Sequence, residues 1–342
     1  MTPKHRSTIV VAVWALAVTL LAGCGGREQL NDQYGRRTGS AAGSINGTSV
    51  FGEMLEEAGH RVRSWRYLSP SLEDADVIVW FPQRDTFGPT GKVFTGAPSP
   101  EGGAWLNDWL QYNETERTLV YVGRDWQAER EYWSNARQLA PAAQQPEFRQ
   151  ELRKAQTSEA SRLSAKPPAA ETWASECDWF HLERGNPKTV AKQLTGELFD
   201  GGNPFAEKTI DPKKANLEHW SSLHPNLQAE TLLADGQGHP IVSEMRFDSS
   251  WTNKPSRLIL VENGCFLLNG ALVNPERRKL AGRLIARLGP PEQRVVFLET
   301  GPAPTIRDTD PNPRPPTGLE LFAVWPIGAV LAQIAALGVV YA

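Results

Sequence analysis

The sequence has few cysteines and none of the common catalytic motifs. Three cysteines occur in 342 residues, and neither G-x-C-x-G nor G-x-S-x-G, the nucleophile turns of many hydrolases, is present. The phosphate-binding pattern G-x-x-x-x-G-K-[ST] and the zinc pattern H-E-x-x-H are also missing. These absences exclude a P-loop nucleotide site and a helical zinc-peptidase site, so we expect no cofactor and no metal.

Neither sign of charge dominates. Lysine and arginine number 36, aspartate and glutamate 39, and the formal net charge is −3. This balance gives no electrostatic reason to expect a nucleic-acid partner. The length suits one large or two small globular domains with a sizeable core.

Two long apolar runs occur, one at each end. The first, Ile9–Leu21, follows the basic residues Lys4 and Arg6 and is too short for a comfortable membrane span. It leads into Leu-Ala-Gly-Cys ending at Cys24, which resembles the bacterial lipobox and implies cleavage and lipid attachment at Cys24. We therefore predict a lipoprotein signal over residues 1–24, with an uncleaved N-terminal anchor as the alternative.

The second run, Leu321–Ala342, has 22 residues without a charge and is long enough to cross a bilayer. We predict a transmembrane helix over residues 319–342, preceded by a proline-rich spacer over residues 300–318. The predicted location is the cell membrane, with the main domain on the extracytoplasmic (periplasmic) side.

Between a polar linker (25–43) and the spacer, residues 44–299 show an α/β pattern. The apolar runs at Val77–Phe81 and Leu119–Val122 predict buried strands, and a helix at Trp105–Tyr112 lies between them. A strand, helix and strand at this spacing favour a parallel sheet. The alternating His60–Leu68 segment predicts an outer, half-exposed strand.

The second half of this domain returns to the sheet after an insertion. Residues 129–226 predict a polar, mainly helical insertion, and residues 227–247 predict a hairpin or edge. Residues 257–269 predict two short strands around Asn263 and Gly264. The helix Pro275–Leu288 is expected between the cap Asn274 and a terminal glycine.

Together the segments NGTSVFGEMLEEAGHRV, DVIVWFP, LVYVG and RLILVENGCFLLNGALVNPERRKLAGRLI resemble domain-of-unknown-function family four-three-five-zero. This family is counted among class I glutamine amidotransferase-like folds. The resemblance implies a flavodoxin-like three-layer sandwich outside the membrane, with no established activity. Members often lie beside genes for a MoxR-type ATPase, which implies a protein partner in a membrane assembly.

The cysteines give the only enzymatic alternative, a divergent amidotransferase-like hydrolase. Cys177 has His181 four residues on, and Cys265 lies between the two predicted strands, where no helix dipole would lower the pKa of its thiol. Export would permit a disulfide between the two cysteines, and two unpaired buried thiols are equally compatible with the sequence.

A candidate ligand crevice follows from a repeated pair. Arg84 and Asp85 follow one predicted parallel strand, and Arg124 and Asp125 follow the next. Because ligands bind beyond the carboxyl ends of such strands, the two arginines are candidates to hold an anion. The turn at Asn46 and Gly47, before a helix N-terminus, is expected beside them. The alternatives are solvated salt bridges and a scaffold role for the turn.

The tryptophans are predicted mainly to build the core. The sequence has twelve tryptophans, and burial in the core is the main prediction for Trp65, Trp80, Trp105, Trp109 and Trp126, with stacking on glycan rings as the alternative.

The histidines give no metal pattern. His219 and His224 are five residues apart and would not share one helical face. His60 and His239 are expected at the surface. The sequence therefore predicts a membrane-tethered binding or assembly module without a catalytic centre, whose small-molecule ligand is not specified.

Overall fold

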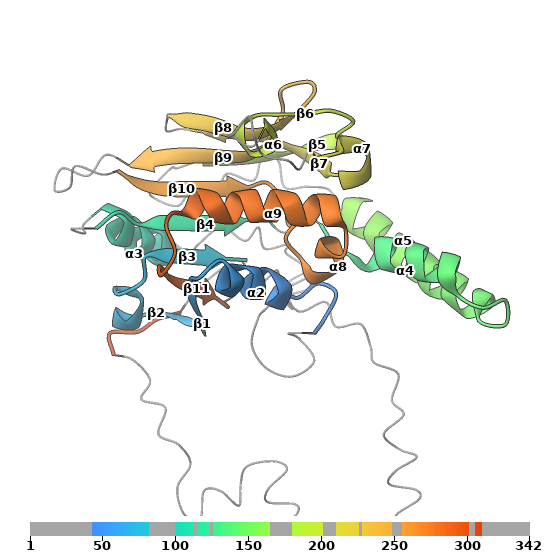
Figure 1. The fold of residues 1–342 in the computed structure, drawn as a ribbon, viewed down its shortest axis with the longest axis horizontal. Coiled ribbons are helices and arrows are strands. Elements are labelled where there is room, and N and C mark those ends of the chain that lie inside the picture. Colours follow the sequence, from blue (N-terminus) through green and yellow to red (C-terminus); the bar gives the residue numbers. More distant parts are fainter. Residues whose placement is uncertain are drawn as a thin grey trace, which may run out of the picture.

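The structure is a computed structural model that describes residues 43–81, 100–111, 115–123, 126–164, 180–200, 210–225, 228–247, 255–300 and 305–309. Eight of the described strands form one sheet with helices on both faces (Figure 1). The protein is therefore a mixed α/β sandwich, as the sequence predicts.

The central sheet is mainly parallel. Its first five strands lie in the spatial order β1, β11, β3, β4, β10 and are parallel to their neighbours. The last three, β9, β8 and β6, pair antiparallel. The bounds are β1 (Arg61–Trp65), β3 (Val77–Trp80), β4 (Thr118–Val122), β6 (Leu194–Thr195), β8 (Ala229–Asp235), β9 (Pro240–Phe247), β10 (Ser256–Val261) and β11 (Arg294–Leu298).

The central and edge strands differ in burial as their sequences predict. Every residue of β3 and β4 is buried, which suits parallel strands covered on both faces. The edge strand β1 alternates between exposed and half-buried residues. Strands β8 and β9 form the expected hairpin, which extends the central sheet.

Alternate residues of each strand face two separate apolar clusters. Val77 and Val79 pack with helices α2 (Ser49–Glu57) and α9 (Pro275–Leu288) on one face. Ile78 and Trp80 pack with α3 (Pro100–Gln111) on the other. The prediction that tryptophans serve the core is confirmed: Trp80, Trp109 and Trp126 are buried, and Trp65 and Trp105 are partly buried against the second cluster.

Helix α9 begins and ends as predicted. The Asn274 side chain accepts a 2.9 Å hydrogen bond from the Glu276 amide at the start of α9, and Gly289 follows its end. Gly59, which follows α2, has φ +91°, a left-handed conformation that favours glycine.

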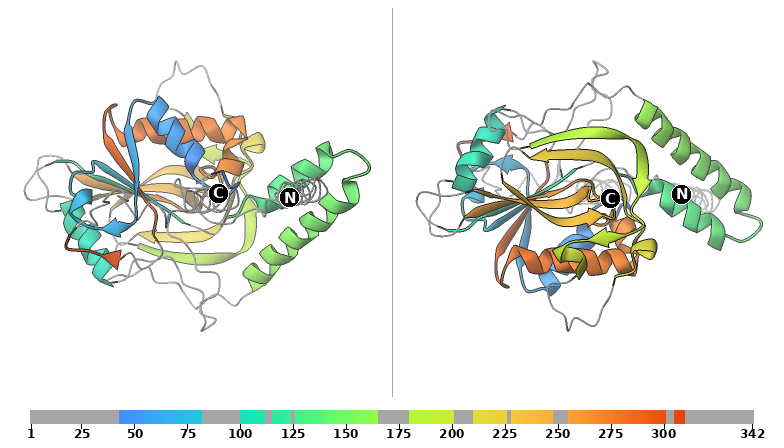
Figure 2. Two further views of the ribbon diagram at one scale, coloured as in Figure 1. Left: turned by 90° about the horizontal axis from the view of Figure 1, so that it is seen from below. Right: turned by 90° about the horizontal axis from the view of Figure 1, so that it is seen from above.

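The first part of the insertion is a helical hairpin. Helices α4 (Glu129–Leu139) and α5 (Gln145–Ser164) pack on each other and project from the body (Figures 1 and 2). The Trp133 and Phe148 rings meet edge to face, with centroids 5.7 Å apart. No residue of α4 is buried, so most of the hairpin surface faces solvent.

The remainder of the insertion contains strands as well as helices. β5 (Phe180–Val190) and β7 (Glu218–Pro225) form a separate antiparallel ribbon, with the short helices α6 (Glu197–Asp200) and α7 (Pro212–Ala215) between them. β6 joins the edge of the central sheet by pairing with β8, and its Leu194 packs in the cluster that holds Val77 and Val79. The expectation of a mainly helical insertion was incomplete.

The predicted second strand after Gly264 is wrong. Residues 265–268 form a turn that leads into α8 (Asn269–Leu272). The Asn263 side chain accepts a 2.9 Å bond from the Cys265 amide, and Gly264 accepts from the Leu267 amide at 3.1 Å. The apolar run is buried as a turn in the main core instead of pairing as a strand.

The predicted membrane segments, 1–24 and 319–342, lie outside the described residues. Within the residues that are described, no helix is both long enough and apolar enough to cross a bilayer. Part of the predicted spacer is described: β12 (Thr305–Ile306) pairs in parallel with β2 (Tyr67–Leu68). The short helix η2 (Pro70–Leu72) follows β2.

Candidate functional site

The strands that were expected to form the crevice are neighbours. β3 and β4 are parallel, with Val77 opposite Thr118 and Trp80 opposite Tyr121. Arg84, Asp85, Arg124 and Asp125 lie outside the described residues. The structure therefore confirms the strand pairing on which the crevice prediction depends and does not test the arginine–aspartate pairs.

The carboxyl ends of β4 and β10 approach very closely. A Cβ atom at Gly123 would lie 1.9 Å from the Glu262 carbonyl oxygen, so only glycine fits this position. The Gly123 amide donates a 2.8 Å bond to the Val261 carbonyl oxygen. This contact fixes where the chain leaves the sheet towards Trp126.

Asn46 and Gly47 hold segments of the chain together. The Asn46 side chain is fully buried and accepts a 2.8 Å bond from the Ala128 amide. The Gly47 carbonyl oxygen accepts a 2.8 Å bond from the Asn269 amide. These contacts favour the scaffold alternative for this turn.

The N-terminus of α2 is closed by a side chain from α8. The Asn269 Oδ1 atom accepts from the Val50 amide at 2.9 Å, while its Nδ2 atom donates to the Ser44 carbonyl oxygen at 2.8 Å. Thr48, at the cap position, makes no side-chain cap bond. Asn269 therefore occupies one of the amides that an anion at this helix end would need.

Cys265 lies in the turn between β10 and α8 and is completely buried. Burial raises the pKa of its thiol to about 12, so the thiolate is not populated at neutral pH. This environment does not suit a nucleophile. Cys177 lies outside the described residues.

A cavity of about 390 Å³ lies at the base of the α4–α5 hairpin. Its lining comes from the segment after β4, from α4 and α5, from the end of α7 and from the start of β7, and includes Trp126, Arg130, Asn135, Gln156, Asn216 and Glu218. Trp126 follows Arg124 and Asp125 closely in the chain. The cavity thus lies near the carboxyl end of β4, where open α/β sheets place their ligands.

A network of charges and hydrogen bonds builds the cavity wall. The buried Glu218 accepts a 3.1 Å hydrogen bond from the Trp126 indole and forms a hydrogen-bonded ion pair with Arg130. Arg130 also approaches Glu159 of α5, with 3.4 Å between nitrogen and oxygen. The wall therefore ties the hairpin to β7 while it presents both signs of charge.

Arg277 of α9 supports this wall from behind and is fully buried. Its guanidinium donates to the Ala215 carbonyl oxygen at 2.8 Å, the Asn216 carbonyl oxygen at 3.1 Å and the Glu131 carboxylate at 2.7 Å. The guanidinium carbon also lies 5.5 Å from the centre of the Trp126 ring. Arg277 therefore joins α9, α7 and α4.

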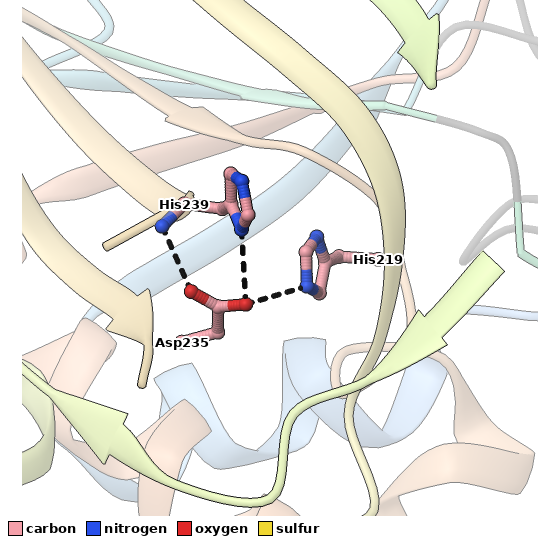
Figure 3. A group of neighbouring side chains, drawn as sticks. All are labelled: His219, Asp235 and His239. Carbon is pink, nitrogen blue, oxygen red and sulfur yellow. Dashed lines mark hydrogen bonds and ion pairs between the residues drawn. The ribbon is translucent and has the colours of Figure 1, made fainter. Parts of the chain in front are cut away.

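A second polar cluster lies where the β5–β7 ribbon meets the central sheet. His219 comes from β7, Asp235 ends β8, and His239 precedes β9. Both imidazoles point towards the same carboxylate (Figure 3). The Asp235 Oδ2 atom is 2.9 Å from His219 Nε2 and 3.1 Å from His239 Nδ1.

The rest of this cluster orients the carboxylate. Asp235 Oδ1 accepts from the amides of Gln237 at 2.9 Å and His239 at 2.8 Å. The hydroxyl of Thr189 lies 2.9 Å from His219 Nε2. Burial lowers the pKa of the His219 imidazole, although the nearby Asp235 charge opposes this shift. Burial alone would raise the pKa of Asp235, but hydrogen bonds from the His239 side chain and from two amides outweigh burial and lower it.

The expected surface positions of the histidines are only half right. The His239 side chain is 48% exposed, as predicted. His60 is buried. It lies between α2 and β1, where its backbone amide donates to the Leu55 carbonyl oxygen. Burial lowers the pKa of its imidazole.

The cavity wall and the histidine cluster were not predicted from the sequence. Arg277 had a detectable signal, since it falls on the apolar stripe of α9 with Leu280, Ala281 and Leu284. The short turn from Asp235 to His239 was visible as a glycine-containing hairpin, but His219 comes from another sheet. No protein-family model, no curated protein and no solved structure matches this chain.

Proposed function

We propose that this chain is a membrane-anchored, envelope-facing binding or assembly module that catalyses no reaction. The apolar segments at 1–24 and 319–342 support the membrane attachment. The family resemblance supports a flavodoxin-like, amidotransferase-related sandwich and a partner in a membrane system that includes a MoxR-type ATPase.

The polar cavity at the base of the α4–α5 hairpin is the observation that carries the binding role. It has a buried carboxylate, a paired arginine and several amide side chains, a lining that suits hydrogen-bonded recognition of a polar group. The projecting hairpin offers accessible surface beside it, so a partner could reach both at once.

The buried thiol of Cys265 supports the absence of catalysis. A pKa of about 12 leaves this cysteine without the thiolate that an amidotransferase-like hydrolase needs. Among the described residues, no cysteine other than Cys265 is available for that role.

A cavity-filling variant tests the binding role. Gln156 lines the cavity from the exposed side of α5, so Gln156→Trp should fill the space while leaving the Glu218 network intact. We expect capture of the partner from detergent-solubilised membranes, measured by quantitative mass spectrometry, to fall at least about fivefold, roughly 1 kcal/mol.

Gln150→Trp is the matched control, because Gln150 is exposed on the same helix and does not line the cavity. It should capture the partner like the wild type. Equal capture by both variants would place the binding surface elsewhere. Rapid alkylation of Cys265 in the folded protein would instead favour the hydrolase alternative.

A further inference from the structure

We propose that His219, Asp235 and His239 bind one divalent transition-metal ion that fastens the β5–β7 ribbon to the central sheet. The side chains come from β7, from the end of β8 and from the β8–β9 turn. The site is separate from the cavity and does not depend on the proposed function.

The three ligand atoms already converge. Each of the three residues offers one ligand atom, a ring nitrogen or a carboxylate oxygen, that lies within 4.8 Å of the other two. Zinc binds nitrogen and oxygen at about 2.0–2.2 Å with tetrahedral geometry, which places neighbouring ligand atoms about 3.3 Å apart. The two separations from Asp235 Oδ2, 2.9 Å and 3.1 Å, are close to this value, and binding would require the two ring nitrogens to adjust to it as well.

The donor set suits such an ion. Two imidazoles and a carboxylate are ligands that zinc, nickel and copper accept. A neutral imidazole and an ionised carboxylate are the forms that bind metal. The Thr189 hydroxyl, beside His219 Nε2, adds an oxygen donor for a fourth position or for orientation.

The surroundings provide both rigidity and access. Two backbone amides hold Asp235 Oδ1 and leave Oδ2 directed at the rings (Figure 3). The side chains of His219 and Asp235 are 6% and 8% exposed, while that of His239 is 48% exposed and gives the ion a path from solvent. An ion here would join two sheets that share no strand pairing.

The test uses the full chain in detergent after removal of metals with a chelator. Titration with zinc alone should give one bound ion per chain, measured by a competing indicator dye, and should raise the melting temperature of the wild type. His239→Ala removes the exposed ligand and should weaken zinc binding at least about tenfold. Gln237→Ala is the matched control, because only the amide of Gln237 contacts Asp235.

The metal-free melting temperature of His239→Ala shows whether that variant folds. If that variant does not fold, the wild type loaded with Co²⁺ tests the proposal instead. X-ray absorption should then detect two imidazole ligands on the bound Co²⁺. Absence of zinc binding by the wild type, equal binding by wild type and His239→Ala, or Co²⁺ without imidazole ligands would each overturn the proposal. The three residues would then be a hydrogen-bonded structural cluster.

Discussion

Arg277 combines full burial with several hydrogen-bond partners. It is fully buried and uses its guanidinium to bind two carbonyl oxygens and one carboxylate. Lysine cannot reproduce this planar set of donors. A buried arginine with these partners stabilises the fold only while all of them are present.

Arg277→Ala should therefore lower the free energy of unfolding by about 3–5 kcal/mol, because Glu131 loses its partner and a cavity opens under Trp126. Arg277→Lys should lie between this variant and the wild type. Thermal and denaturant unfolding of the detergent-solubilised protein measure the changes.

Arg278→Ala is the control, since the adjacent Arg278 is exposed, and it should stay within about 0.5 kcal/mol of the wild type. Similar small losses for the alanine variants at both positions would contradict the role assigned to Arg277.

Among the elements, β9 is joined to α9 and β10 by one buried carboxylate. Glu244 in β9 lies 2.8 Å from Arg287 of α9, 3.1 Å from Arg246 and 3.9 Å from Arg257 of β10. Burial alone would raise the pKa of Glu244, but the bonds and charges of these arginines outweigh burial and lower it. The carboxylate is therefore more acidic in the folded than in the unfolded protein.

This pKa difference predicts an acid-sensitive contact between elements. Its contribution is complete above the unfolded glutamate pKa of about 4.3 and is lost as the pH falls through the lower folded value. Glu244→Gln should cost about 2–3 kcal/mol at pH 7 and should flatten the loss of stability below about pH 4.3. Urea unfolding over a series of pH values measures both effects.

Glu230→Gln provides the comparison for this contact. Glu230 also binds Arg246, at 3.2 Å, but its side chain is 53% exposed, so its loss should cost under about 1 kcal/mol. Parallel stability curves for wild type and Glu244→Gln below pH 4 would show that this carboxylate does not govern the acid response.

On the scale of the whole molecule, the first helix and the last strand of the described chain lie near the β1 edge of the central sheet, on opposite faces (Figures 1 and 2). Helix α2 packs in the cluster that holds Val77, whereas β12 pairs with β2, whose Leu68 packs in the cluster that holds Ile78. This placement is compatible with attachment of both ends to one membrane surface. Both predicted anchors, residues 1–24 and 319–342, could then attach the domain to the same membrane.

If both predicted anchors form, either of them alone should keep the protein attached to the membrane. Cys24→Ala should abolish labelling by an alkynyl fatty acid yet leave the protein in the membrane fraction, because the predicted transmembrane helix over residues 319–342 would still hold it there. Deletion of residues 319–342 should leave the lipid label in place. Carbonate extraction followed by immunoblotting measures membrane retention. Equal labelling of the wild type and Cys24→Ala would favour the uncleaved anchor.

Local sequence patterns predicted the elements that depend on near neighbours in the chain. The buried strands β3 and β4, the edge strand β1 and the capped helix α9 follow from apolar periodicity and from Asn274, Pro275 and Gly289. The parallel pairing of β3 and β4 followed from the length of the α3 crossover between them. These features need little knowledge of the rest of the chain.

The candidate sites depend instead on contacts between distant segments. Asn269 closes the N-terminus of α2 from 219 positions away, and Asn46 holds Ala128 from 82 positions away. His219 meets Asp235 and His239 only because the β5–β7 ribbon packs on the β8–β9 turn. Periodicity along a sequence carries no information on such contacts, because it does not say which strands and helices become neighbours.

The sequence by itself determined the α/β class, the parallel pairing of β3 with β4 and the caps of α9. These features depend on hydrophobic burial and backbone conformation over short stretches of the chain. Tertiary structure alone decided that Cys265 lies inert in a buried turn, that Arg277 supports a polar cavity and that two histidines share one carboxylate. Desolvation and pairing of charges are set by the atoms that surround a group, and folding brings those atoms from several elements.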